Sequence, residues 1–145
     1  MTACVIDASV AVKLFFEEEL TEHAETLFAS STAQPPARFY VPGLFYLECA
    51  SVFWKHCRRF GYPVDQARDA LGDLHALGLL SAPVKGLMSP GFEIALEYGI
   101  TVYDASYVTL ADRLDVPLVT ADEKLVRLLA DTEHDVRWLG ALSPR

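Results

Sequence analysis

The chain has 145 residues, of which 52% are hydrophobic and 22% charged, a balance typical of a globular domain and unlike that of a disordered segment. Its formal net charge of −8 argues against broad binding to nucleic acid or anionic membranes, although bound divalent cations can reverse the sign of a local site. No signal-peptide pattern and no apolar run long enough to span a membrane is present in the sequence. We therefore expect one domain over residues 1–145, no membrane segment and a cytoplasmic location.

The expected elements alternate between strands and helices along the whole chain. Short apolar, β-branched runs predict strands over 3–7, 39–42, 79–84, 117–122 and 136–140. Apolar residues at helical spacing predict helices over 9–18, 20–31, 44–60, 64–77, 89–99, 104–115 and 123–130. This alternation predicts βαβ units, and hence an α/β fold of three layers, α/β/α, with a central, mostly parallel sheet.

Glycine and proline set several of the expected boundaries. The prolines at 35 and 36 end the second helix, Gly61 stops the long third helix, and Pro63 starts the next one. The sequence contains no internal repeat, linker or low-complexity segment, which agrees with the expectation of one domain.

The cysteines and histidines do not form a recognisable metal or nucleophile motif. Cys4, Cys49 and Cys57 are odd in number and contain no CxxC pair, so we expect buried, reduced thiols. The four histidines match no metal-binding spacing. The sequence therefore indicates neither zinc chemistry nor a cysteine or serine nucleophile.

Three aspartates are expected at one edge of the sheet. Asp7 ends the first strand, Asp122 ends the strand over 117–122, and Asp104 opens a helix. Ligands of open α/β sheets bind at the carboxyl ends of the strands, where these side chains would meet. Glu48 lies inside the long helix, one residue after Leu47.

Each acid alone has a structural explanation. An aspartate at a helix start commonly caps backbone N–H groups, and Glu48 alone could be a solvated or ion-paired residue. Four carboxylates at one site would repel one another and raise each other's pKa unless cations bound there. Because Mg²⁺ and Mn²⁺ prefer such oxygen ligands, the combination favours a metal site over four separate caps.

Four short segments carry a family resemblance: VIDASV, LFYLECASV, YDASYVTLA and LVTADEKL. In order and spacing they resemble the four acidic motifs of the PIN domain, and most closely those of the VapC toxins of toxin–antitoxin pairs. The resemblance implies a cytoplasmic endoribonuclease dependent on Mg²⁺ or Mn²⁺, commonly a homodimer and neutralised by a cognate antitoxin. It makes Asp7, Glu48, Asp104 and Asp122 the catalytic, metal-binding acids.

The resemblance also assigns hydroxyl groups to the site. Ser9 and Thr120 fall where the family has hydroxyls that bind the metal or its waters. Because no histidine, cysteine or lysine is placed to attack phosphorus, the expected nucleophile is a metal-activated water, giving 5′-phosphate and 3′-hydroxyl ends. Whether one or two ions bind stays open, as do the RNA and the antitoxin.

Other functions remain as alternatives or are set aside. A phosphoacceptor receiver domain needs a second acid beside Asp7 and a late-strand lysine, and a haloacid-dehalogenase-type phosphatase needs DxD, which Asp7-Ala8-Ser9 does not supply. The serious alternative is a catalytically silent PIN-like module that acts by binding a partner or RNA.

The sequence gives weaker indications of contacts to an RNA substrate than of the acidic site. The basic cluster of Lys55, Arg58 and Arg59, together with Lys13, could hold phosphates, although basic residues in the last turn of a helix also complement its dipole. Six aromatic residues fall in two predicted helices of the N-terminal half, 9–18 and 44–60, where most would be core and some could form a self-association or antitoxin surface. They are Phe15, Phe16, Phe45, Tyr46, Phe53 and Trp54.

Overall fold

The computed structural model describes residues 1–143, and its centre is a five-stranded sheet in the order β3-β2-β1-β4-β5. Every neighbouring pair of strands is parallel. The strands are β1 (Ala3–Ile6), β2 (Arg38–Pro42), β3 (Leu80–Ala82), β4 (Leu118–Thr120) and β5 (Val136–Trp138). This confirms the expected α/β fold with a parallel sheet.

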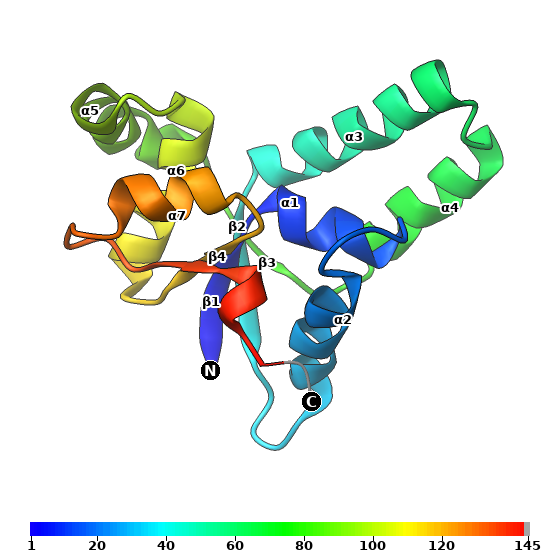
Figure 1. Cartoon of the computed structure of the whole chain (residues 1–145), viewed down its shortest axis with the longest axis horizontal. Coiled ribbons are helices and arrows are strands. Elements are labelled where there is room, and N and C mark those ends of the chain that lie inside the picture. The colour runs from blue at the N-terminus through cyan, green and yellow to red at the C-terminus, as the bar shows by residue number, and fades with distance from the viewer. Residues whose placement is uncertain (144–145) are drawn as a thin grey trace.

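The helices cover both faces of this sheet. They are α1 (Ala8–Ala11), α2 (Thr21–Ala29), α3 (Leu44–Phe60), α4 (Val64–His75), α5 (Met88–Tyr98), α6 (Val102–Leu114) and α7 (Glu123–Leu129). In Figure 1, α1 to α4 lie on one side of the sheet and α5 to α7 on the other. The strand order explains this division, because right-handed crossovers toward β3 and toward β5 place their helices on opposite faces.

β1 lies in the middle of the sheet and forms the centre of the core. Val5 is in register with Tyr40 of β2 and Leu118 of β4. The side chains of Cys4, Val5 and Ile6 are fully buried. A strand covered on both faces reads as a continuous apolar run, which is how the sequence reads up to Asp7.

The third and fourth helices form an arm that projects from the sheet (Figure 1). The predicted bounds of α3, residues 44–60, are correct, because Gly61 takes the left-handed conformation (φ 66°) that ends a helix. Phe53 on α3 is buried between the arm and the N-terminal segment. None of the helices formed by residues 1–143 is long and apolar enough to cross a membrane.

The first helix is shorter than predicted, and this expectation was wrong. Helix α1 ends at Ala11 and is followed only by a 3₁₀ turn over Val12–Leu14, so 15–18 is not helical. The reason is tertiary packing: the rings of Phe15 and Phe16 lie 5.6 and 5.0 Å from that of Phe53. Aromatic packing against α3 therefore replaces continuation of the helix.

Candidate active site

Asp7 follows the last residue of β1, and its carboxylate is held by two hydroxyl groups. Ser9 Oγ and Thr120 Oγ1 both donate to Asp7 Oδ2, at 2.9 and 2.7 Å. Ser9 Oγ also accepts a bond from the backbone N–H of Ala121 at 3.1 Å. These bonds join the carboxyl ends of β1 and β4, which are neighbours in the sheet. Asp7 is therefore fixed at the edge where the sequence placed it.

Asp7 is the N-cap residue of α1, although its side chain makes no well-formed capping hydrogen bond to that helix. Burial raises the pKa of its carboxyl, and the hydroxyls of Thr120 and Ser9 and the backbone N–H groups of Ala8 and Ser9 act against this rise. The hydroxyl contacts to Ser9 and Thr120 are not needed for a helix cap, so capping alone does not account for Asp7.

Glu48 reaches the same edge from α3 and meets a tyrosine of α6. Tyr107 Oη donates to Glu48 Oε1 at 2.6 Å, and the tyrosine ring is almost completely buried. Because α3 and α6 belong to opposite layers, this bond links the two layers across the carboxyl edge of the sheet (Figure 1). The bond engages Oε1 of the Glu48 carboxylate.

Asp104 and Asp122 stand at the start of two helices on the other side of the edge. Asp122 does cap its helix, because its Oδ1 accepts from the N–H groups of Lys124 (3.0 Å) and Leu125 (3.3 Å). Asp104 is instead in the first turn of α6, whose cap is Thr101. Asp104 and Asp122 line one cavity of about 180 Å³.

Burial and mutual repulsion perturb this group of acids. Burial is the main cause that raises the pKa of Asp7, Glu48 and Asp104, the last to about 6. The charge of Asp7 contributes to the raised pKa of both Glu48 and Asp104, and that of Asp122 also acts on Asp104. The structure therefore brings the four carboxyl groups within electrostatic range of one another.

The donor set fits a hydrated divalent cation. None of the ion pairs within residues 1–143 includes any of the four acids, so their charge is stabilised only by hydroxyl and N–H donors in this part of the chain. The described residues also contain no group of three potential ligands already arranged to hold an ion. Mg²⁺ usually keeps several waters and binds only one or two carboxylates directly, so a site for it does not require three protein ligands already in place.

The thiols offer no competing nucleophile. Cys4 and Cys49 are buried and free, and burial raises the pKa of both thiols to about 12. Cys57 is free and half-buried. Since the thiolate is the reactive form, buried protonated cysteines are inert.

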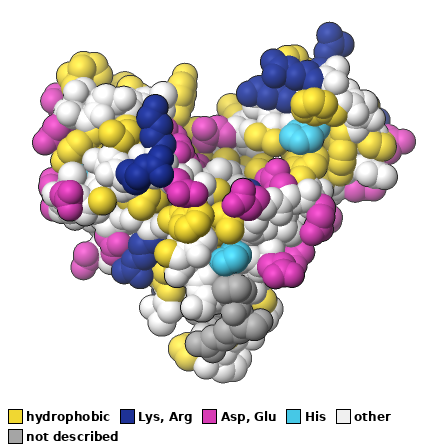
Figure 2. All heavy atoms as spheres, in the orientation of Figure 1, with side chains coloured by type: hydrophobic (Ala, Val, Ile, Leu, Met, Phe, Trp, Pro, Cys, Tyr) yellow, Lys and Arg dark blue, Asp and Glu magenta, His cyan; other side chains and the backbone are white. Residues whose placement is uncertain are grey.

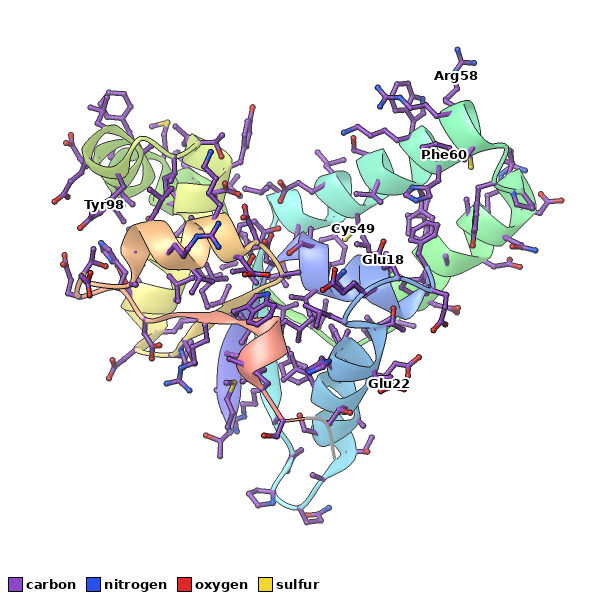
Figure 3. All side chains as sticks on the ribbon, in the orientation of Figure 1. Glu18, Glu22, Cys49, Arg58, Phe60 and Tyr98 are labelled. Atoms are coloured by element: carbon purple, nitrogen blue, oxygen red, sulfur yellow. The ribbon has the colours of Figure 1, made fainter. Side chains whose placement is uncertain are left out.

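The basic residues proposed from the sequence lie apart from the acids. Lys13 is buried and its Nζ pairs with Glu18 Oε1 at 3.2 Å. Lys55, Arg58 and Arg59 are exposed at the outer end of α3, where Figure 2 shows a cluster of basic side chains. Figure 3 shows Arg58 projecting from that end, beyond the notch that opens above the carboxyl edge. At 1.5 Å per residue, Arg58 is roughly 15 Å along the helix from Glu48.

Sequence reasoning did not find Tyr107. The sequence did contain an indication of its position, because Tyr107 follows Asp104 by three residues and residues at this spacing share one face of a helix. Two of the six aromatic residues that it did single out, Phe45 and Phe53, are buried, whereas Trp54 is exposed and the other three are half-buried.

Comparison with known proteins identifies the family. The PIN domain model matches residues 4–129. Ribonuclease VapC3 of Pyrobaculum aerophilum is 36% identical over 123 residues, covering 83% of this chain and 90% of the relative. Ribonuclease VapC9 of Mycobacterium tuberculosis is 34% identical over 121 residues, covering 83% and 87%.

Solved structures agree at the level of the fold. PAE2754 from Pyrobaculum aerophilum superimposes with a TM-score of 0.68 at 24% identity, covering 95% of this chain and 92% of the other. VapBC2 from Rickettsia felis, bound to a DNA fragment from its promoter, gives 0.65 at 13% identity with coverage of 94% and 98%. The chain belongs to the PIN domain family.

Proposed function

We propose that the chain is a divalent-metal-dependent endoribonuclease that acts as the toxin of a VapC-type toxin–antitoxin pair. The observation that carries the proposal is Asp7: a buried carboxylate at the carboxyl edge of the sheet, held by two hydroxyls and without a cationic partner within residues 1–143. The relatives at 36% and 34% identity are named VapC ribonucleases, which gives the same class of reaction.

The four acids have distinct tasks in this proposal. Asp7 and Glu48, which are oriented by hydroxyl donors, would bind Mg²⁺ or Mn²⁺. Asp104 and Asp122 bind the metal or its waters from the opposite side, with Asp122 also capping α7. Ser9 and Thr120 orient Asp7. A bound cation supplies an activated water and neutralises charge that develops on the phosphate.

The proposed partners are an RNA substrate, a cognate antitoxin and a second copy of the chain. Structural neighbours include a toxin–antitoxin complex from Klebsiella pneumoniae, with a TM-score of 0.63. For the homodimer we propose the exposed apolar face of α5, where Met88, Phe92 and Leu96 follow at intervals of four residues. We place the activity in the cytoplasm, where RNA is available.

The proposed phosphate contacts away from the acids are those of the outer end of α3: Lys55, Arg58 and Arg59. They are exposed and form no ion pair within residues 1–143, so their charge is free to meet an RNA backbone. Lys13 is a weaker candidate, because its ammonium already bonds to Glu18.

A second candidate function is a catalytically silent PIN-like module that binds a partner or RNA. It is favoured by one observation: the residues that the structure describes contain no group of three ligands arranged to hold an ion. An enzyme and a silent module differ in turnover, which can be measured directly.

The test is cleavage of total RNA by the purified protein in Mn²⁺ or Mg²⁺, with EDTA as the control. We expect cuts that appear only with metal, and products with 5′-phosphate and 3′-hydroxyl ends. Sequencing those ends identifies the cleavage site. A folded protein that binds RNA but leaves it uncut in either metal would favour the silent module.

The metal is tested separately by thermal melting with and without Mn²⁺. A ligand that binds only the native state stabilises it by about 2.7 kcal/mol at a concentration 100 times its Kd. For a domain of this size, that shifts the melting midpoint upward by roughly 5–10 °C. An unchanged midpoint at millimolar Mn²⁺ would contradict the metal site.

A further inference from the structure

A cavity beside the acids is open for a part of the substrate. It has a volume of about 180 Å³ and lies between the start of α6 and α7. Asp104 and Asp122 belong to its lining, so the cavity adjoins the candidate metal site. The rest of the lining consists of Gly99, Ile100, Thr101, Lys124, Leu125 and Leu128. The lining therefore combines two carboxylates and a lysine with apolar side chains.

Lys124 is the basic side chain of this lining, and its position is unusual. It lies in the first turn of α7, where the positive end of the helix dipole disfavours a cation. Helix stability therefore does not explain a lysine at this position. A residue that breaks a local rule without a structural gain points to function.

Lys124 also forms no ion pair within the described part of the chain. By contrast, Arg127, one turn later on the same helix, pairs with Glu123 at 3.6 Å. The side chain of Lys124 is exposed and lines the cavity next to two carboxylates. A cation held there attracts an anion that approaches the acids.

We infer that this cavity is a subsite for the nucleotide next to the cleaved bond, with Lys124 contacting its phosphate. The inference rests on the proposed ribonuclease function and adds a substrate contact to it. The base of this nucleotide packs on the apolar wall formed by Ile100 and Leu128, with the Thr101 hydroxyl beside it. The wall offers no built pattern of donors and acceptors, so the subsite accepts any base.

This subsite differs from the basic cluster at the outer end of α3. Arg58 is roughly 15 Å along the helix from Glu48, so it can contact only RNA distant from the cut. Lys124 is two residues from Asp122 and shares a cavity with it. A contact so near the reacting phosphate fixes the register of the strand at the metal site.

The experiment measures binding of a fluorescent, random-sequence single-stranded oligoribonucleotide by anisotropy in Mg²⁺, over a series of salt concentrations. All proteins carry Asp7→Asn so that the RNA stays intact. We expect Lys124→Gln to raise Kd about fivefold and to reduce the salt slope by about 0.7, the value for one phosphate contact on a single strand. Lys124→Arg restores both quantities.

The matched control is Arg127→Gln, which removes one positive charge from the same helix away from the cavity. It is expected to leave Kd and the salt slope unchanged, and the melting midpoints of all variants should agree. Unchanged binding by Lys124→Gln, with RNA bound normally by the parent protein, would overturn the subsite alone. A wild-type protein that neither binds nor cuts RNA in Mg²⁺ would overturn the subsite together with the proposed function.

Discussion

The two edges of the sheet both carry clusters of acidic residues, but basic side chains pair with acids at only one of them. At the amino edge, Asp112, Asp115, Glu133, His134 and Asp135 line a cavity of about 360 Å³. His134 Nδ1 lies 2.8 Å from Asp112 Oδ2. Arg137 pairs with Asp135 at 2.9 Å. Most of the acids at this edge thus have a basic side chain close by, whereas Asp115 forms no ion pair within residues 1–143.

At the carboxyl edge, the cavity is smaller, about 180 Å³, and the acids contact only hydroxyl and N–H donors. The pKa of Asp104 is raised to about 6, mainly by burial. The size of a cavity therefore does not identify the candidate active site. What distinguishes the carboxyl edge is that Asp7 is buried and that none of the four acids forms an ion pair within residues 1–143, a charge that we propose a metal ion offsets.

The largest predicted effect is found by replacing one aspartate with asparagine at each edge of the sheet and comparing the two variants. Asp7→Asn keeps the shape of the side chain and an acceptor for Ser9 and Thr120, but removes the charge. We expect cleavage to fall by about 10³-fold, because metal binding contributes several kcal/mol to the transition state. In EDTA, the variant is expected to be at least as stable as the wild type, because it carries no buried charge. Cleavage rates and urea unfolding measure the two effects.

Asp112→Asn is the matched control at the amino edge. It weakens the contact with His134, so we expect a loss of about 1 kcal/mol in unfolding free energy and an unchanged cleavage rate. A folded Asp7→Asn protein that cuts RNA at the wild-type rate would remove the distinction between the edges.

The next effect concerns the bond that joins the two layers above the carboxyl edge. Tyr107→Phe leaves the buried ring in place and removes the hydroxyl that holds Glu48 Oε1 at 2.6 Å. Groups that orient metal ligands typically contribute 10–100-fold to metal affinity or activity. We therefore expect cleavage to fall by about that factor at low Mn²⁺ and to recover partly at high Mn²⁺.

Tyr40→Phe is the control for this prediction. Tyr40 is half-buried on β2, and its hydroxyl has no hydrogen-bond partner within residues 1–143. It is expected to leave the Mn²⁺ dependence unchanged. The same Mn²⁺ dependence in Tyr107→Phe and wild type would show that Glu48 is positioned without this bond.

Much of the fold could be predicted, because local signals and tertiary structure agree in most of the chain. Gly61 ends α3 at the residue predicted, and the apolar runs before Asp7 and Asp122 are strands. The edge at which the acids lie followed from the strand–helix alternation. The first helix could not be predicted, since Phe15 and Phe16 have helical spacing and leave the helix only because Phe53 packs against them.

The site could be predicted less completely than the fold. The acids are recognisable by type and order, but their partners come from distant segments: Thr120 lies 113 residues from Asp7, and Tyr107 lies 59 from Glu48. Lys124 was not predicted to contact the substrate, because a single lysine does not form a recognisable sequence motif. Its meaning depends on a cavity that only the folded chain forms.

The smallest predicted effect is the pH dependence of stability in EDTA. Asp104 has an ordinary pKa of 3.8 and a pKa of about 6 in the folded protein, so the native state binds more protons than the unfolded state between these values. The raised pKa of Asp7 and Glu48 acts in the same direction. The resulting stabilisation is complete below about pH 4 and is lost as the pH rises through 6.

Urea unfolding at pH 5 and pH 7.5 tests the direction in which stability changes with pH, and we expect bound metal to reverse that direction. In EDTA, we expect the wild type to be more stable at pH 5, and Asp104→Asn to have a smaller difference, because the substitution removes one of the titrating groups. In saturating Mn²⁺ the order reverses, since protons then compete with the cation for the same carboxylates. Acid also weakens the overall charge repulsion that comes from the net charge of −8, but this effect is common to wild type and variant. The difference between the two proteins therefore isolates the contribution of Asp104. A wild type more stable at pH 7.5 than at pH 5 in EDTA would mean that the carboxyl edge is compensated in the metal-free protein, as most of the amino edge is.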